Sequence, residues 1–193
     1  MNLLHIDSSA LAANSVTRQL TAAIVARWQD EVPGLEVTYR DLDAEPLPHL
    51  TGPVLTKADP DIAEASERAL QQFLDADVIV IGAPMYNFGV PSTLKAWIDR
   101  IAVAGRTFRY TQNGPEGLAG DKQVIIASGR GSVHGDAAAS DFQEAYLKFV
   151  LGFLGIRNVS FVRAEGVGLS PQHRSDAIAA ALAAIPEPLR EAA

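Results

Sequence analysis

Three short segments of this sequence combine hydroxyl, glycine and aromatic residues that suit the binding of a phosphate and a flat ring. The first, residues 8–17, carries the hydroxyls of Ser9, Ser15 and Thr17 where a helical pattern begins. Together with the first N–H groups of a helix, that of Val16 included, such hydroxyls form an anion site. The segment has no lysine, which excludes a P-loop and fits a monophosphate that is bound but never transferred. The alternative is that Ser15 caps an ordinary helix.

The second segment, residues 83–91, places a methionine and two aromatic rings directly after an apolar run. It contains Met85, Tyr86, Asn87 and Phe88 in succession. So many large side chains at one strand end cannot all enter the core. We expect them to cover one edge and face of an isoalloxazine ring, with backbone N–H groups near its polar atoms. The alternative is a tight turn packed beneath the next helix.

The third segment, residues 127–134, is rich in glycine. It contains Ser128, Gly129, Arg130 and Gly131. The glycines permit a close approach of the backbone to a planar ligand, and Arg130 is expected to offset negative charge on a reduced flavin. The alternative is a flexible surface turn. His134 is a weak candidate for proton delivery, and we name no obligatory catalytic acid or base.

Composition excludes several other classes of function. The 193-residue chain has no cysteine, and its four histidines have no spaced carboxylate partners, so no metal site is expected. A net charge of −7 argues against a nucleic-acid partner. Neither a signal peptide nor a membrane-length apolar run is present, which favours a cytoplasmic protein. The absence of a G-x-S-x-G sequence disfavours a hydrolase.

Five apolar runs alternate with stretches of helical periodicity, which predicts the elements that position the three segments. We expect strands at 3–6, 35–42, 78–81, 124–127 and 159–162. We expect helices at 15–28, 61–76, 91–102, 140–154 and 170–184, and a small hairpin near 108–114. Such alternation implies an α/β fold in which helices cover both faces of a five-stranded parallel sheet. We expect one domain over residues 1–193.

The expected strand order is the flavodoxin-like, doubly wound 2-1-3-4-5. A Rossmann sheet is disfavoured because no G-x-G-x-x-G follows the first strand. Ligands of doubly wound sheets lie outside the carboxyl ends of the strands, where the strand order reverses. The three segments follow the first, third and fourth strands, so they should meet there. Together they predict one non-covalently bound FMN.

With these segments in place, the sequence resembles the FMN-dependent NADH:quinone oxidoreductases, also called azoreductases, over nearly its whole length. The resemblance is carried by residues 83–88, by residues 107–118 (TFRYTQNGPEGL) and by the Ser-rich first segment. Relatives usually have Ser-Arg-Gly-Gly after the fourth strand, whereas this chain has Ser-Gly-Arg-Gly-Ser at 128–132. The family pattern therefore does not specify which N–H here meets the flavin, nor where Arg130 points.

The resemblance implies a homodimer with FMN sites near its interface. NADH would reduce the flavin and leave, and a quinone or an aromatic azo compound would then take two electrons in a ping-pong sequence. Tyr110, Phe153 and Phe161 would help to line the substrate face. The absence of an Arg/Lys cluster for a 2′-phosphate favours NADH over NADPH. Two alternatives stay open, a flavodoxin-type electron carrier and an NAD(P)H:flavin reductase; the insertion at 108–118 favours the enzyme over the carrier.

The helix expected at 140–154 has two apolar faces, and a helix that covers one sheet needs a single stripe. The first face carries Phe142, Tyr146, Phe149, Val150 and Phe153. The second carries Leu147, Leu151 and Leu154. We expect the extra face to pack against a second subunit, the alternative being that both faces are buried within one chain.

Overall fold

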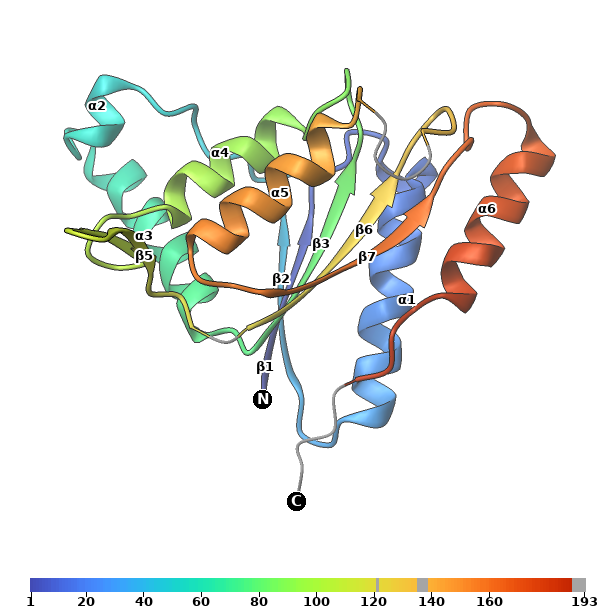
Figure 1. The fold of residues 1–193 in the computed structure, drawn as a ribbon, viewed down its shortest axis with the longest axis horizontal. Helices are drawn as coiled ribbons and strands as arrows, with labels where there is room; N and C mark the ends of the chain where they lie inside the picture. Colours follow the sequence, from blue (N-terminus) through green and yellow to red (C-terminus); the bar gives the residue numbers. More distant parts are fainter. Residues whose placement is uncertain (121, 135–138, 189–193) are drawn as a thin grey trace.

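A computed structural model describes residues 1–120, 122–134 and 139–188, and its centre is a five-stranded parallel sheet (Figure 1). The strands are β1 (Asn2–Asp7), β2 (Glu36–Asp41), β3 (Val78–Pro84), β6 (Gln123–Gly129) and β7 (Asn158–Ala164). Their order is β2-β1-β3-β6-β7, which confirms the doubly wound, flavodoxin-like arrangement. The loops after β1, β3 and β6 therefore leave the same edge of the sheet.

Burial along the strands explains their places in the sheet. All seven residues of β3 are buried, as a central strand covered on both faces requires, whereas β2 at one edge is half-buried or exposed throughout. Successive side chains of a strand point to opposite faces. Ile79 of β3 accordingly joins one core and Val80 joins the other.

Five long helices cover the two faces of the sheet. These are α1 (Val16–Glu31), α3 (Pro60–Asp75), α4 (Ser92–Ile101), α5 (Phe142–Phe153) and α6 (Pro171–Ala183). Figure 1 shows α1 and α6 on one face and α3, α4 and α5 on the other. Trp28 of α1 is buried in the core that contains Val80, and Phe73 of α3 packs edge-on against Trp97 of α4 in the core that contains Ile79. In the described part of the chain, no helix is both long and apolar enough to cross a membrane.

Capping groups mark the helix starts. Ser15, Asp59, Asp141 and Ser170 each accept hydrogen bonds from N–H groups of the first turn that follows. Two short helical segments were not predicted, η1 (Ala12–Asn14) and α2 (Gly52–Leu55). Segments of three or four residues are too short to display helical periodicity.

The expected hairpin is present as β4 (Phe108–Thr111) paired antiparallel with β5 (Gly114–Gly117). It leaves the end of α4 and returns beside the C-terminal end of α5. There Gly117 lies so close to the backbone that a Cβ would stand 2.1 Å from the amide nitrogen of Gly155. The hairpin is thus held against α5 by direct backbone packing.

Candidate functional site

The three predicted segments meet at the carboxyl edge of the sheet. The Tyr86 hydroxyl lies 3.3 Å from Ser9 Oγ and accepts a hydrogen bond of 3.2 Å from the N–H of Ala10. The loop after β3 is joined to the end of β6 by the bond from Met85 N–H to the Gly129 carbonyl, at 2.8 Å. The Phe88 ring meets His134 edge-on at 6.3 Å between centroids. Long-range contacts therefore assemble the loops that the sequence singled out.

The first segment forms a buried cluster of hydroxyls at the start of α1. Ser9, Ser15 and Thr17 are each only 1% exposed, and the hydroxyls of Ser15 and Thr17 lie 3.1 Å apart. Ser15 Oγ accepts the N–H of Arg18, so Ser15 is a cap, as the alternative reading held. The N–H groups of Val16 and Thr17 precede the first acceptor within the helix and point along its axis. Hydroxyls and helix N–H groups at one place provide the donor set that suits a phosphate.

Close approach at Gly129 sets the position of that helix start. A Cβ on Gly129 would lie 3.0 Å from Thr17 Cγ2, so any larger residue would force the Thr17 side chain to shift. Val16 is buried against the same strand end, with its Cβ 3.9 Å from the same point. The glycine here serves the packing of α1 on the sheet as well as any approach by a ligand.

The second segment is a tight turn whose aromatic residue is exposed. Tyr86 and Gly89 exchange two backbone hydrogen bonds of 3.1 and 3.0 Å. The two residues between them have positive φ angles, 49° for Asn87 and 68° for Phe88. Positive φ is rare and strained for a residue such as Phe, and such strain gathers at functional sites. Because 53% of Phe88 is exposed, the turn does not bury this ring beneath the next helix.

A groove of about 710 Å³ adjoins this turn. Its lining comes from the turn, from the start of α4 and from the first two turns of α5. The lining residues are Tyr86, Asn87, Gly89, Val90, Ser92, Lys95, Phe142 and Tyr146. Ser92 and Lys95 were not predicted as site residues. The available signal was Pro91, which predicted a helix start directly after the aromatic turn. Because the side chains of a helix tilt toward its N-terminus, residues of the first turn lie near the preceding loop.

The third segment differs from the expectation for Arg130. Its guanidinium is 1% exposed and bonds to carboxylates of Asp141 (2.7 Å), Glu144 (2.6 Å) and Glu165 (2.8 Å). Three carboxylates thus already neutralise this charge, and the structure does not support a role in offsetting charge on a flavin. The Ser128 hydroxyl is also turned inward, to Gln143 at 2.9 Å. The exposed part of this segment is the stretch from Gly131 to Val133, beyond the two inward side chains.

The three residues that the resemblance assigned to the substrate face lie away from the groove within one chain. Tyr110, on the hairpin, is 77% exposed. Phe153 lies at the far end of α5 and contacts Phe108 at 4.6 Å between ring centroids. Phe161 lies in the middle of β7, with Lys148 4.9 Å above its ring. None of the three lines the groove beside the aromatic turn.

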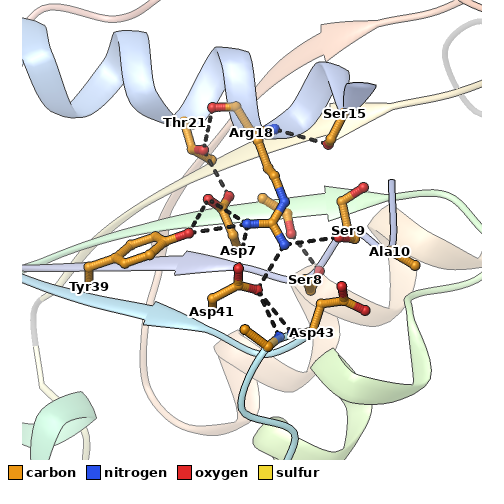
Figure 2. Close-up of polar contacts among 12 residues, drawn as sticks. Asp7, Ser8, Ser9, Ala10, Ser15, Arg18, Thr21, Tyr39, Asp41 and Asp43 are labelled. Atoms are coloured by element: carbon orange, nitrogen blue, oxygen red, sulfur yellow. Dashed lines mark hydrogen bonds and ion pairs between the residues drawn. The ribbon is translucent and has the colours of Figure 1, made fainter. Parts of the chain in front are cut away.

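A network of charged side chains lies directly behind the first segment (Figure 2). Arg18 of α1 forms two hydrogen bonds with Asp41 at the end of β2, of 2.7 and 2.8 Å. Asp7, at the end of β1, accepts hydrogen bonds from Thr21 at 2.9 Å and Tyr39 at 3.1 Å. A Cβ on Gly82 would lie 2.7 Å from Asp7 Oδ1, so glycine at that position leaves room for the carboxylate.

The network shifts the pKa values of its members. The hydrogen bonds of Arg18 hold the pKa of Asp41 below its ordinary value. Burial by itself would raise the pKa of Asp7, but His5, Thr21 and Tyr39 more than offset it, and the pKa is lowered. Burial, with the Asp7 carboxylate beside it, raises the pKa of Tyr39 to about 12. At neutral pH the network therefore holds two carboxylates and one guanidinium.

Comparison with known proteins agrees with this geometry. A family model described as a flavodoxin-like fold matches residues 1–189. The FMN-dependent NADH:quinone oxidoreductase 1 of Xanthomonas euvesicatoria pv. vesicatoria is 66% identical over 187 residues, covering 97% of this chain and 96% of that protein. The corresponding protein of Stenotrophomonas maltophilia is 62% identical over 186 residues, covering 96% and 95%.

Solved structures give the same result. The crystal structure of an azoreductase from Bacillus anthracis superposes with a TM-score of 0.85 at 31% identity, over 95% of each chain. The likeness in sequence and in structure thus extends over almost the whole chain. On these grounds the chain belongs to the family of flavodoxin-like FMN-dependent NADH:quinone oxidoreductases.

Proposed function

We propose that this protein transfers two electrons from NADH to quinones, and to aromatic azo compounds, through one non-covalently bound FMN per chain. The observation that carries this proposal is the convergence of three loops, which places a buried hydroxyl cluster at a helix N-terminus beside an aromatic turn and an open groove. The relatives that are more than 60% identical have names that specify FMN, NADH and quinone.

Each part of the site has its own task. Ser9, Ser15 and Thr17, with the first N–H groups of α1, hold the phosphate. The turn at 86–89 presents its backbone and its aromatic ring to the flat ring system, and the groove beside it admits the substrate. When bound, FMN accepts a hydride from NADH and passes two electrons to the acceptor. Reduction of a quinone consumes NADH and a proton and yields NAD⁺ and the hydroquinone, whereas cleavage of an azo bond to two amines takes two NADH.

A test on the purified protein separates this proposal from the two alternatives. We expect a yellow protein with one FMN per chain that oxidises NADH rapidly when benzoquinone is added without any partner protein. A flavodoxin-type carrier would give no turnover in this mixture. A flavin reductase would instead bind flavin weakly, with a rate that saturates in free FMN.

A matched pair of substitutions tests the hydroxyl cluster. Thr17→Val keeps the shape of the side chain and removes one donor, and we expect FMN affinity to fall about tenfold, the value of one hydrogen bond to a charged group. Thr56→Val, at the end of the short exposed α2, is the control and should leave FMN affinity unchanged. Flavin fluorescence titrations measure both. Equal affinities for the two variants would remove Thr17 from the phosphate site.

The proposal includes a homodimer that completes the substrate pocket. The leucine face of α5 is buried in the chain's own core, through Leu147 and Leu151. The other face leaves Phe142 64% and Phe149 76% exposed, and the Tyr110 ring is exposed on the neighbouring hairpin. An exposed apolar surface of this kind is typical of protein–protein contacts.

Phe149→Glu tests this assembly without disturbing the core, since that ring is mostly in solvent. We expect the wild-type protein to behave as a dimer in light scattering, and the variant to dissociate more readily and to lose quinone turnover while retaining its melting temperature. Leu182→Glu, at an exposed apolar residue of α6 on the other face of the sheet, is the control for added negative charge. A fully active wild-type monomer near 20.5 kDa would refute the dimer.

A further inference from the structure

Arg18 connects the phosphate segment to the sheet, and the proposed chemistry makes no use of its side chain. It is the third residue of α1, and its guanidinium is 16% exposed. One nitrogen donates to the carbonyl of Ser9 at 3.0 Å, and the same guanidinium holds Asp41 through two bonds (Figure 2). Its backbone N–H donates to Ser15 Oγ at 3.2 Å. One residue therefore ties together both ends of the segment from Ser9 to Ser15.

The bond to the Ser9 carbonyl determines which way the next peptide group faces. In a trans peptide the C=O and the following N–H point in opposite directions. With the Ser9 carbonyl directed at Arg18, the N–H of Ala10 points to the other side, where it and Ser9 Oγ meet the Tyr86 hydroxyl. If this peptide turned over, a carbonyl oxygen would replace the N–H that now donates to the Tyr86 hydroxyl, and an acceptor that repels an anion would lie beside Ser9 Oγ.

The Arg18 guanidinium lies between the first segment and two carboxylates, those of Asp41 and Asp7. Asp41 lies 2.7 Å from Arg18, and Asp7 lies 3.7 Å from it. Asp41 also accepts a hydrogen bond of 3.0 Å from the N–H of Asp43, which fixes the Arg18–Asp41 pair at the end of β2. Without Arg18, these carboxylates would be unneutralised behind a site that must bind a phosphate.

We propose that Arg18, held by Asp41, is the positioning residue that makes this site selective for a phosphorylated flavin. It keeps the Ser9 carbonyl turned away from the hydroxyl cluster, so that no backbone acceptor faces the phosphate there, and it neutralises the carboxylates behind. This inference rests on the proposed function, because it assigns the phosphate of FMN to the cluster of Ser9, Ser15 and Thr17. It concerns the discrimination between FMN and riboflavin, which have the same ring system.

The experiment compares affinities for FMN and riboflavin, by fluorescence titration of full-length protein freed of flavin. We expect Arg18→Gln to weaken FMN binding about 10- to 100-fold, as the loss of charged hydrogen bonds implies, and to change riboflavin binding little. Asp41→Asn keeps the shape of the side chain but removes the ion pair. It should likewise reduce the preference for FMN over riboflavin. Arg18→Lys keeps the charge, but a lysine cannot bond to Ser9 and to both oxygens of Asp41 at once. Its FMN affinity should therefore lie between those of the wild type and Arg18→Gln.

Arg27→Gln is the matched control, because Arg27 lies on the same helix and pairs with Glu31 away from the site. It should leave both affinities unchanged. If Arg18→Gln does not fold, the double variant Arg18→Gln, Asp41→Asn removes the unpaired carboxylate and carries the same expectation. Equal weakening of FMN and riboflavin would reduce Arg18 to a packing role and overturn the proposal.

The affinities of the wild-type protein distinguish a failure of the proposed function from a failure of the role given to Arg18. A wild-type protein that binds FMN no better than riboflavin contradicts the phosphate site of the proposed function, and the role of Arg18 with it. A wild-type preference for FMN that survives in all the Arg18 and Asp41 variants contradicts the role of Arg18 alone.

Discussion

Arg130→Met should lower the free energy of unfolding by about 3 kcal/mol, the lower end of the usual cost of removing one member of a buried group of ion pairs. The guanidinium is 1% exposed, and Asp141, Glu144 and Glu165 all bond to it at 2.6–2.8 Å. Methionine fills a similar volume but removes the guanidinium that bonds to all three carboxylates; Glu144 keeps its two hydrogen bonds from Arg163. Urea unfolding followed by circular dichroism, at matched flavin content, measures the loss.

The control is Arg109→Met, which removes an ion pair of equal length from the surface. Arg109 and Glu116 are 2.8 Å apart across the hairpin, but their side chains are 58% and 48% exposed. Water screens such a pair, so its loss should cost less than about 1 kcal/mol. Similar losses of unfolding free energy in the two variants would mean that burial does not determine how much the ion pairs of Arg130 contribute to stability.

The pH dependence gives an independent check on Arg130. Burial alone would raise the pKa of Asp141, but backbone N–H groups and Arg130 lower it below the ordinary value. A lowered carboxyl pKa contributes stability above about pH 4, and this is lost as the pH falls through the folded-state pKa. Since Arg130→Met removes part of this contribution, the difference in stability between variant and wild type should narrow below about pH 4.

Gly117→Ala should separate the hairpin from α5 and cost about 3 kcal/mol, the upper end for overpacked positions, because the obstacle is backbone. The new Cβ would stand 2.1 Å from Gly155 N and 2.3 Å from the Leu154 carbonyl carbon. The hydrogen bond from Ala119 N–H to the Leu154 carbonyl, at 3.0 Å, lies beside this contact and would break. Because the displaced hairpin carries Tyr110, quinone turnover should fall while FMN affinity stays near the wild-type value.

Gly152→Ala, within α5, is the matched control for Gly117→Ala. A Cβ there meets nothing within 4 Å, and alanine favours a helix over glycine by up to about 1 kcal/mol. We therefore expect this control to be neutral or slightly stabilising in urea unfolding. A Gly117→Ala protein as stable as the control, with normal turnover, would contradict the packing described for the hairpin.

Local signals determined much of this structure from the sequence alone. Runs such as 78–81 and 124–127 predicted central strands because strands covered on both faces are apolar throughout. Ser170 and Pro171 predicted a helix start because the side chain caps the helix and proline suits its first turn. The order of these elements then placed the three loops at one edge, since parallel strands share their carboxyl ends.

Only the tertiary structure decided which partner each charged or aromatic side chain meets. Arg18 and Asp41 are 23 residues apart, and Arg130 and Glu165 are 35 apart, so no local pattern links them. For this reason the sequence predicted Arg130 at the ligand, whereas the fold buries it among carboxylates. It likewise predicted two apolar faces on α5, but could not tell that the core would cover the leucine face and also contact Tyr146, Val150 and Phe153, so that Phe142 and Phe149 are left exposed. Local propensity specifies the elements and their order, but pairing between distant segments depends on how those elements pack.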